Sequence, residues 1–235
     1  MASLYVDGIR SVAPEGPNYL AGYSSGGTLA LEMAQQLRAQ GEEVALLAMI
    51  DSEAPESQPG DNRWRLRHVP AFIANVARWA VQDDFFRSGP RLMLENVRSK
   101  LRLLRAMVTS RLVRRDSEAD IRDVLRVWQF PDKHRAFLEA HHRALSNYRP
   151  QPYPGPITLI RAGTLPLFSP PEYDLGWGRI ATGRLEVKVI PGAHDNILAE
   201  PRVRLLAAQL RVCLRESAAM IPDVAKLLGV VAVFM

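Results

Sequence analysis

The sequence predicts an α/β domain with a parallel β-sheet and a helical subdomain inserted between two of its strands. Two observations predict this class. Residues 44–50 are continuously apolar, which is typical of a strand buried on both faces of a parallel sheet. Residues 63–147 show no strand pattern, whereas strand patterns precede and follow them.

The first fifty residues predict a helix, a strand, a second helix and a second strand. Apolar residues at helical spacing predict the first helix over 4–12; they are Leu4, Tyr5, Ile9 and Val12. An apolar run over 18–23 predicts the first strand. The helix after it has one apolar face and ends at Gly41, where a left-handed cap is favoured. With the run 44–50 this order indicates a βαβ unit.

The rest of the chain predicts helices and then a return to the sheet. Strands are expected over 157–160 and 185–190, and Pro201 opens a last helix. The helices expected in the insert cover 64–81, 91–113, 119–128 and 134–148. The predicted division is a core of 1–53 and 148–219, a helical lid of 54–147, and a tail of 220–235 without an assigned role.

Composition excludes several classes of protein. The 235 residues are 47% hydrophobic and 23% charged, as in globular proteins that are neither fibrous nor disordered. A net charge of +5 is too small to indicate nucleic-acid binding. Cys213 is the only cysteine, so neither an internal disulfide nor a cysteine-rich metal site is expected. A reducing cytoplasm is the expected location. No secretory signal or membrane span is predicted.

Residues 22–26 read Gly-Tyr-Ser-Ser-Gly and match G-x-S-x-G between a predicted strand and a predicted helix. This is the context of the nucleophile elbow of α/β-hydrolases, in which a serine stands on a sharp turn. Such a turn needs small neighbours at Gly22 and Gly26, and Gly27 lets helix and strand approach closely. Ser24 is the expected nucleophile, and the backbone N–H of Ser25 is expected to face an oxyanion. The alternative is a plain glycine-rich turn.

A serine nucleophile needs an imidazole base and a carboxylate to orient it. His194 directly follows the last predicted core strand, where the base of an α/β-hydrolase lies. Asp51 ends the strand beside the serine strand and is the expected acid, with Glu172 and Asp174 as weaker candidates. The other histidines lie in the insert and are expected to be ordinary helical residues: His68, His134, His141 and His142.

Several segments together resemble the thioesterase domains that end nonribosomal peptide and polyketide synthetases. The resemblance runs from about residue 4 to 214, and its segments are residues 9–27, 44–52, 148–156, 175–178 and 189–194. In that family the acid follows the strand next to the serine strand, where Asp51 lies. The Tyr-Ser-Ser of the elbow resembles the product-releasing branch more than the stand-alone editing branch.

The resemblance implies an α/β-hydrolase fold with a helical lid and a serine thioesterase. Such an enzyme transfers an acyl chain from the phosphopantetheine arm of a carrier protein to Ser24, and water or an internal nucleophile releases it. His194 would be the base and Asp51 its orienting group. The expected partner is a carrier protein, in cis or within a synthetase complex, and no cofactor or metal is expected. The alternatives are an inactive module that only docks a carrier protein and a hydrolase of free esters.

Two features depart from the family pattern. The family has strands ahead of the first helix, so we expect this chain to be N-terminally truncated, with an uncovered edge on the serine strand. The tail of 220–235 resembles nothing in the family.

The segment 87–115 holds nine basic residues and one acidic residue within an amphipathic helical pattern. A solvated helix face is the plain interpretation. A docking surface for an acidic carrier protein is the second, with Arg98, Arg102 and Arg105 as its candidate contacts, and a membrane-surface helix is the third.

Overall fold

The computed structural model describes residues 1–12, 16–55, 140–141, 143–164, 172–194, 196–219 and 231–234. The chain divides into two compact units, Met1–Gln82 with Tyr148–Met235 and Asp83–Asn147. The helices predicted over 64–81, 91–113 and 119–128 lie outside the described residues. Of the fourth, residues 140–141 and 143–147 are described and helical.

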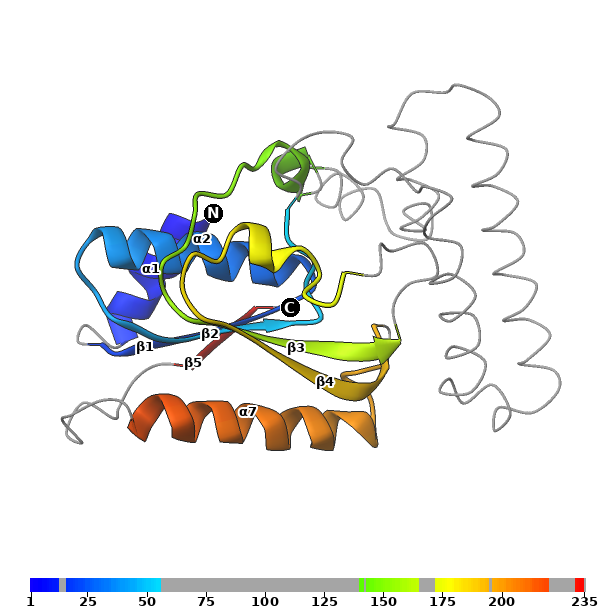
Figure 1. Cartoon of the computed structure of the whole chain (residues 1–235). Coiled ribbons are helices and arrows are strands. Elements are labelled where there is room, and N and C mark those ends of the chain that lie inside the picture. Colours follow the sequence, from blue (N-terminus) through cyan, green and yellow to red (C-terminus); the bar gives the residue numbers. More distant parts are fainter. Residues whose placement is uncertain are drawn as a thin grey trace, which may run out of the picture. The chain divides into compact units, whose positions relative to one another are not determined.

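The first unit contains a parallel sheet, and five strands of it are described (Figure 1). Their order across the sheet is β4-β3-β2-β1-β5, and every neighbouring pair is parallel. Because all five run in one direction, their carboxyl ends meet at the same edge. The strands are β1 (Asn18–Tyr23), β2 (Val44–Ile50), β3 (Ile157–Thr164), β4 (Leu185–Ala193) and β5 (Val231–Phe234).

Helices cover both faces of this sheet. Helices α1 (Ala2–Val12) and α2 (Ser25–Ala39) lie on one face, and α7 (Arg202–Ala219) lies on the other (Figure 1). Alternate residues of β2 enter the two cores: Leu47 and Met49 pack with the helices of the first face, and Leu46, Ala48 and Ile50 pack on the side of α7. Burial on both faces explains why this strand is apolar without alternation.

Helix α1 turns a different face to the core from the one the sequence indicates. Ala2, Val6 and Ile9 are buried, whereas Leu4 and Val12 are exposed. The helix is therefore found as predicted, and of the four apolar residues that predicted it Ile9 is buried. Apolar residues lie on more than one side of this helix, so their spacing alone does not select the side that packs.

The edge of β1 also differs from the expectation. Residues 231–234, from the tail to which no role was assigned, pair in parallel with β1 from Tyr19 to Gly22. The expected uncovered edge of the serine strand is therefore wrong: β5 covers it. A run of four residues is too short for its sequence to indicate a pairing partner more than two hundred residues away.

Candidate active site

Ser24 stands on a sharp turn between β1 and α2. Its backbone has φ 53° and ψ −124°, a conformation that non-glycine residues rarely adopt. Its N–H donates to the carbonyl of Ile50 at 3.0 Å, and its carbonyl accepts from the Gly27 N–H at 3.1 Å. These bonds fix the turn at the carboxyl edge of the sheet, with the first N–H groups of α2 directly after the serine.

Gly22 and Gly27 allow the turn because no Cβ would fit in their place. A Cβ at Gly22 would collide with the carbonyl of Gly26, and it would lie 2.5 Å from the Gly27 nitrogen. A Cβ at Gly27 would collide with the side chain of Ser52, the residue that follows Asp51. The close approach at Gly22 closes the elbow, and the close approach at Gly27 brings α2 against the end of β2.

Asp51 directly follows β2 and is buried, with 7% of its surface exposed. Its φ of 43° is, like that of Ser24, in the left-handed region. Its Oδ1 accepts the backbone N–H of Ala162 at 2.7 Å, and its Oδ2 lies 2.8 Å from Nδ1 of His194. Strained backbone at two adjacent strand ends is typical of functional sites.

His194 directly follows β4, on a turn fixed by its neighbours. Asn196 accepts the Ala193 N–H through Oδ1 at 2.8 Å, and Ile197 donates its N–H to the Ala193 carbonyl at 3.0 Å. Gly192 has φ 131°, and a Cβ there would lie 2.7 Å from the Arg202 side chain. The His194 side chain is 42% exposed, so the imidazole is accessible from outside while Nδ1 faces Asp51.

The structure therefore joins two of the three predicted catalytic residues directly. The carboxylate and imidazole are in contact. Ser24 lies at the same edge of the sheet, because it directly follows β1, the neighbour of the strand that Asp51 follows. The Ser24 hydroxyl makes no hydrogen bond with a described residue in this conformation. Hydrogen bonds of catalytic groups are often long or poorly aligned without substrate.

The other candidate acids have different partners. Asp174 accepts the N–H groups of Gly176 and Gly178 at 3.0 and 2.9 Å. Glu172 lies 3.5 Å from the guanidinium of Arg179. Among the carboxylates that sequence analysis considered, Asp51 is the one whose described contacts include His194.

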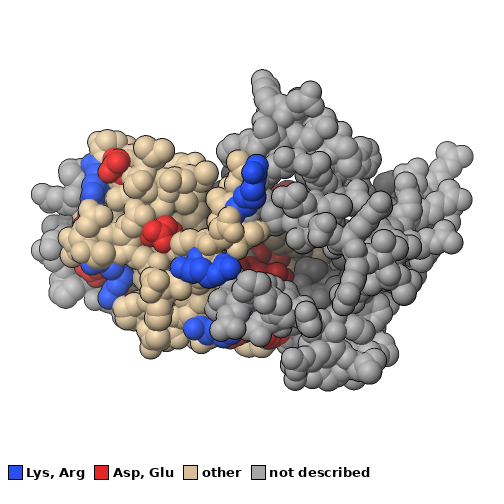
Figure 2. Space-filling model, turned by 90° about the horizontal axis from the view of Figure 1, so that it is seen from above, with Lys and Arg blue, Asp and Glu red and all other residues tan. Residues whose placement is uncertain are grey.

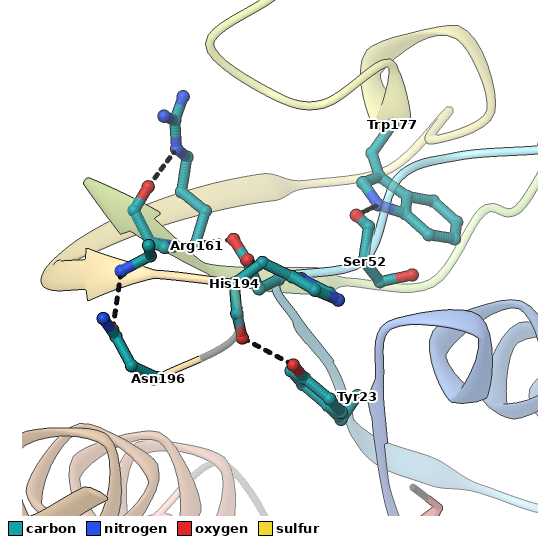
Figure 3. A network of polar contacts seen from close by, with 9 residues as sticks. Tyr23, Ser52, Arg161, Trp177, His194 and Asn196 are labelled. Atoms are coloured by element: carbon teal, nitrogen blue, oxygen red, sulfur yellow. Dashed lines mark hydrogen bonds and ion pairs between the residues drawn. The ribbon is translucent and has the colours of Figure 1, made fainter. Parts of the chain in front are cut away.

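A buried tryptophan holds the segment that follows Asp51, and sequence analysis gave it no role. Trp177 is fully buried, and its indole N–H donates to the Ser52 carbonyl at 2.7 Å (Figure 3). Close to this bond in both segments, the Ala54 N–H donates to the Leu175 carbonyl at 2.9 Å. Both bonds connect the loop after β2 to the segment before β4.

Tyr23 was likewise missed as a site residue. It contacts His194 through both its ring and its hydroxyl. The sequence places it beside Ser24, but nothing in the local pattern indicates a partner 171 residues later.

The remaining predicted features give a more limited result. Arg98, Arg102 and Arg105 lie outside the described residues. Charged side chains of both signs are scattered over the described part of the face in Figure 2. In the described ranges, no group of three or more His, Cys, Asp or Glu side chains could hold a metal ion. No helix described here is long and apolar enough to cross a bilayer.

Comparison with known proteins identifies the chain's relatives. The family model described as "Thioesterase domain" matches residues 1–210. A dimodular nonribosomal peptide synthase of Bacillus subtilis is 27% identical over 92% of this chain. Enterobactin synthase component F of Escherichia coli is 58% identical over 65 residues, 28% of this chain. The chain spans less than a tenth of these curated relatives, 8% and 5% respectively.

Solved structures agree on the fold. The thioesterase domain of NocB, in covalent complex with a fluorophosphonate nocardicin G analogue, has a TM-score of 0.53. It is 26% identical, over 91% of this chain and 73% of that one. A four-domain nonribosomal peptide synthetase, holo-AB3403, has a TM-score of 0.55 at 24% identity, over 95% of this chain and 16% of its own. The fold is thus that of the α/β-hydrolase thioesterases, as expected from the sequence.

Proposed function

The chain belongs to the thioesterase domain family, and on that premise we propose that it releases a chain bound as a thioester to a carrier protein. The released group is an acyl, peptidyl or polyketide chain on a phosphopantetheine arm. The observation that carries the proposal is the 2.8 Å contact between Asp51 and the His194 imidazole, beside the strained turn of Ser24. The synthetases among its relatives support a carrier protein as partner, in cis or within a complex.

In the first half-reaction, the neutral His194 imidazole removes the proton of the Ser24 hydroxyl as its oxygen attacks the thioester carbonyl. Asp51 accepts the Nδ1–H bond, so Nε2 carries the lone pair that takes this proton. The C–S bond then breaks, and the imidazolium returns the proton to the departing thiolate. Contact between the hydroxyl and the imidazole has to form when the acyl chain is loaded.

In the second half-reaction, His194 deprotonates water or a nucleophile of the acyl chain itself, which attacks the carbonyl of the Ser24 ester. The C–O bond breaks, the serine oxygen recovers the proton, and an acid or a macrocycle is released. We propose that the Ser25 N–H, in the first turn of α2 at its positive end, stabilises the negative oxygen of each tetrahedral intermediate. We propose that the reaction needs no metal or cofactor. We also propose a cytoplasmic location for the protein, which fits its single cysteine.

Two measurements test the proposal against the alternatives. A fluorophosphonate should modify the wild-type protein covalently at Ser24 and leave Ser24→Ala unmodified; absence of labelling in a folded wild-type protein would support a module that only docks a carrier. Turnover of an acyl carrier thioester should exceed that of the matching free ethyl ester. The reverse order would favour a free-ester hydrolase.

A further inference from the structure

The side chain before the nucleophile is attached to the histidine at two points. The Tyr23 ring stacks on the His194 imidazole, with centroids 4.9 Å apart and ring planes 17° from parallel. Its hydroxyl donates a 2.6 Å hydrogen bond to the His194 backbone carbonyl (Figure 3). Tyr23 is the last residue of β1, so Ser24 follows it immediately.

These contacts add to the hydrogen bond between the His194 imidazole and Asp51. A hydrogen bond at Nδ1 fixes the distance to the carboxylate but does not by itself fix the plane of the ring. The His194 side chain is 42% exposed, and solvent does not restrict the movement of the exposed part of the ring. A parallel ring at stacking distance limits the swing, and the hydroxyl bond fixes the backbone from which the imidazole projects.

We propose that Tyr23 is a positioning residue that sets where the His194 imidazole stands relative to the Ser24 hydroxyl. Because Tyr23 and Ser24 are consecutive, the rigid end of β1 carries both the nucleophile and the side chain that holds its base. Tyr23 itself takes no part in proton transfer. The expected effect of Tyr23 on catalysis rests on the proposed function, whereas the position that Tyr23 gives the His194 imidazole does not.

Two substitutions separate the two contacts. Tyr23→Phe keeps the ring and removes the hydroxyl bond, and we expect kcat to fall about 3- to 10-fold, in line with one neutral hydrogen bond. Tyr23→Leu removes both contacts and should lower kcat about 10- to 100-fold. KM for a small acyl thioester should stay within about twofold in both, because uniform binding of substrate is not changed.

Tyr19→Phe is the matched control on the same strand. Tyr19 is buried, whereas Tyr23 is partly exposed, and the Tyr19 hydroxyl has no hydrogen-bond partner in the described part of the chain. The same chemical change should therefore leave kcat unaltered. If neither Tyr23→Phe nor Tyr23→Leu has a lower kcat than Tyr19→Phe, neither contact has a positioning role and the proposal is overturned.

A measurement that does not need turnover keeps the inference separate from the proposed function. In NMR spectra, the imidazole protons of His194 should show a ring-current shift that Tyr23→Phe retains and Tyr23→Leu loses. If the wild-type protein is inactive but Tyr23→Leu loses the shift, the proposed function is refuted and the inference about Tyr23 stands. Unchanged imidazole signals in a folded Tyr23→Leu variant would refute the stacking, whatever the activity.

Discussion

Replacing Asp51 by asparagine should remove catalysis while leaving the fold intact. Oδ1 accepts the Ala162 N–H at 2.7 Å, and Oδ2 contacts Nδ1 of His194 at 2.8 Å. In Asp51→Asn, the amide oxygen has to face the Ala162 N–H, so the amide NH₂ faces the imidazole. Nδ1 must then be the acceptor, and the ring proton moves to Nε2, which can no longer take the proton of Ser24.

This change of tautomer costs about 10⁴ in kcat in serine hydrolases that use the same arrangement, or about 5 kcal/mol of barrier. The Tm should change little, because the bond to Ala162 is kept. Asp51→Ala removes both bonds and leaves the Ala162 N–H buried without a partner, which should also destabilise the fold by about 1–3 kcal/mol. Comparing the two variants separates the orienting role from the structural one.

The assay is steady-state hydrolysis of a short acyl thioester of N-acetylcysteamine, followed by the release of thiol, with thermal unfolding in parallel. Asp174→Asn is the control, since the described contacts of that carboxylate are N–H groups of its own turn rather than the imidazole. It should stay within about threefold of wild type in kcat, as expected for a residue outside the reacting groups. The reasoning is refuted if Asp51→Asn keeps more than about a tenth of wild-type kcat, or if Asp174→Asn loses more than it does.

Three further outcomes are expected. Gly22→Ala places a Cβ against the Gly26 carbonyl and should lower the Tm by about 5–10 °C with loss of thioesterase activity; unchanged unfolding in calorimetry would show that the elbow is not sterically tight. Burial raises the pKa of the Cys213 thiol, so its alkylation by iodoacetamide should be at least about 100-fold slower in the native protein than in concentrated guanidinium chloride; equal rates by mass spectrometry would show that the thiol is accessible. Reversing Arg102 and Arg105 to Glu should slow turnover of a carrier-bound thioester but spare a small soluble one, and equal loss on both substrates would exclude a docking role.

The sequence predicts the parts of this fold that depend on local pattern. Strand β2 is found as predicted, because burial on both faces requires an unbroken apolar run. The edge of the sheet at which Asp51 and His194 meet follows from the ends of β2 and β4. The choice of Asp51 over Glu172 and Asp174 follows from its place at the end of the strand beside the serine strand, and the family resemblance agrees with it.

Other features depend on contacts that no local pattern contains. Strand β5 finds β1 across most of the chain. The partner of the Tyr23 hydroxyl is a backbone carbonyl, which carries no signal of its own in the sequence. The buried face of α1 does not follow from its sequence, because Leu4 and Val12 are exposed and are as apolar as the residues that pack. In each case tertiary packing selects among options that the sequence leaves equal.

The most direct test of the account is intact-mass analysis after mixing the protein with an acyl-loaded carrier protein and quenching rapidly in acid. We expect wild type to gain the mass of the acyl group, which peptide mapping then locates on the peptide that contains Ser24, and Ser24→Ala to gain nothing. An acyl adduct of equal amount on Ser24→Ala, or consumption of the carrier thioester by wild type with no adduct at any quench time, would contradict the acyl-serine mechanism.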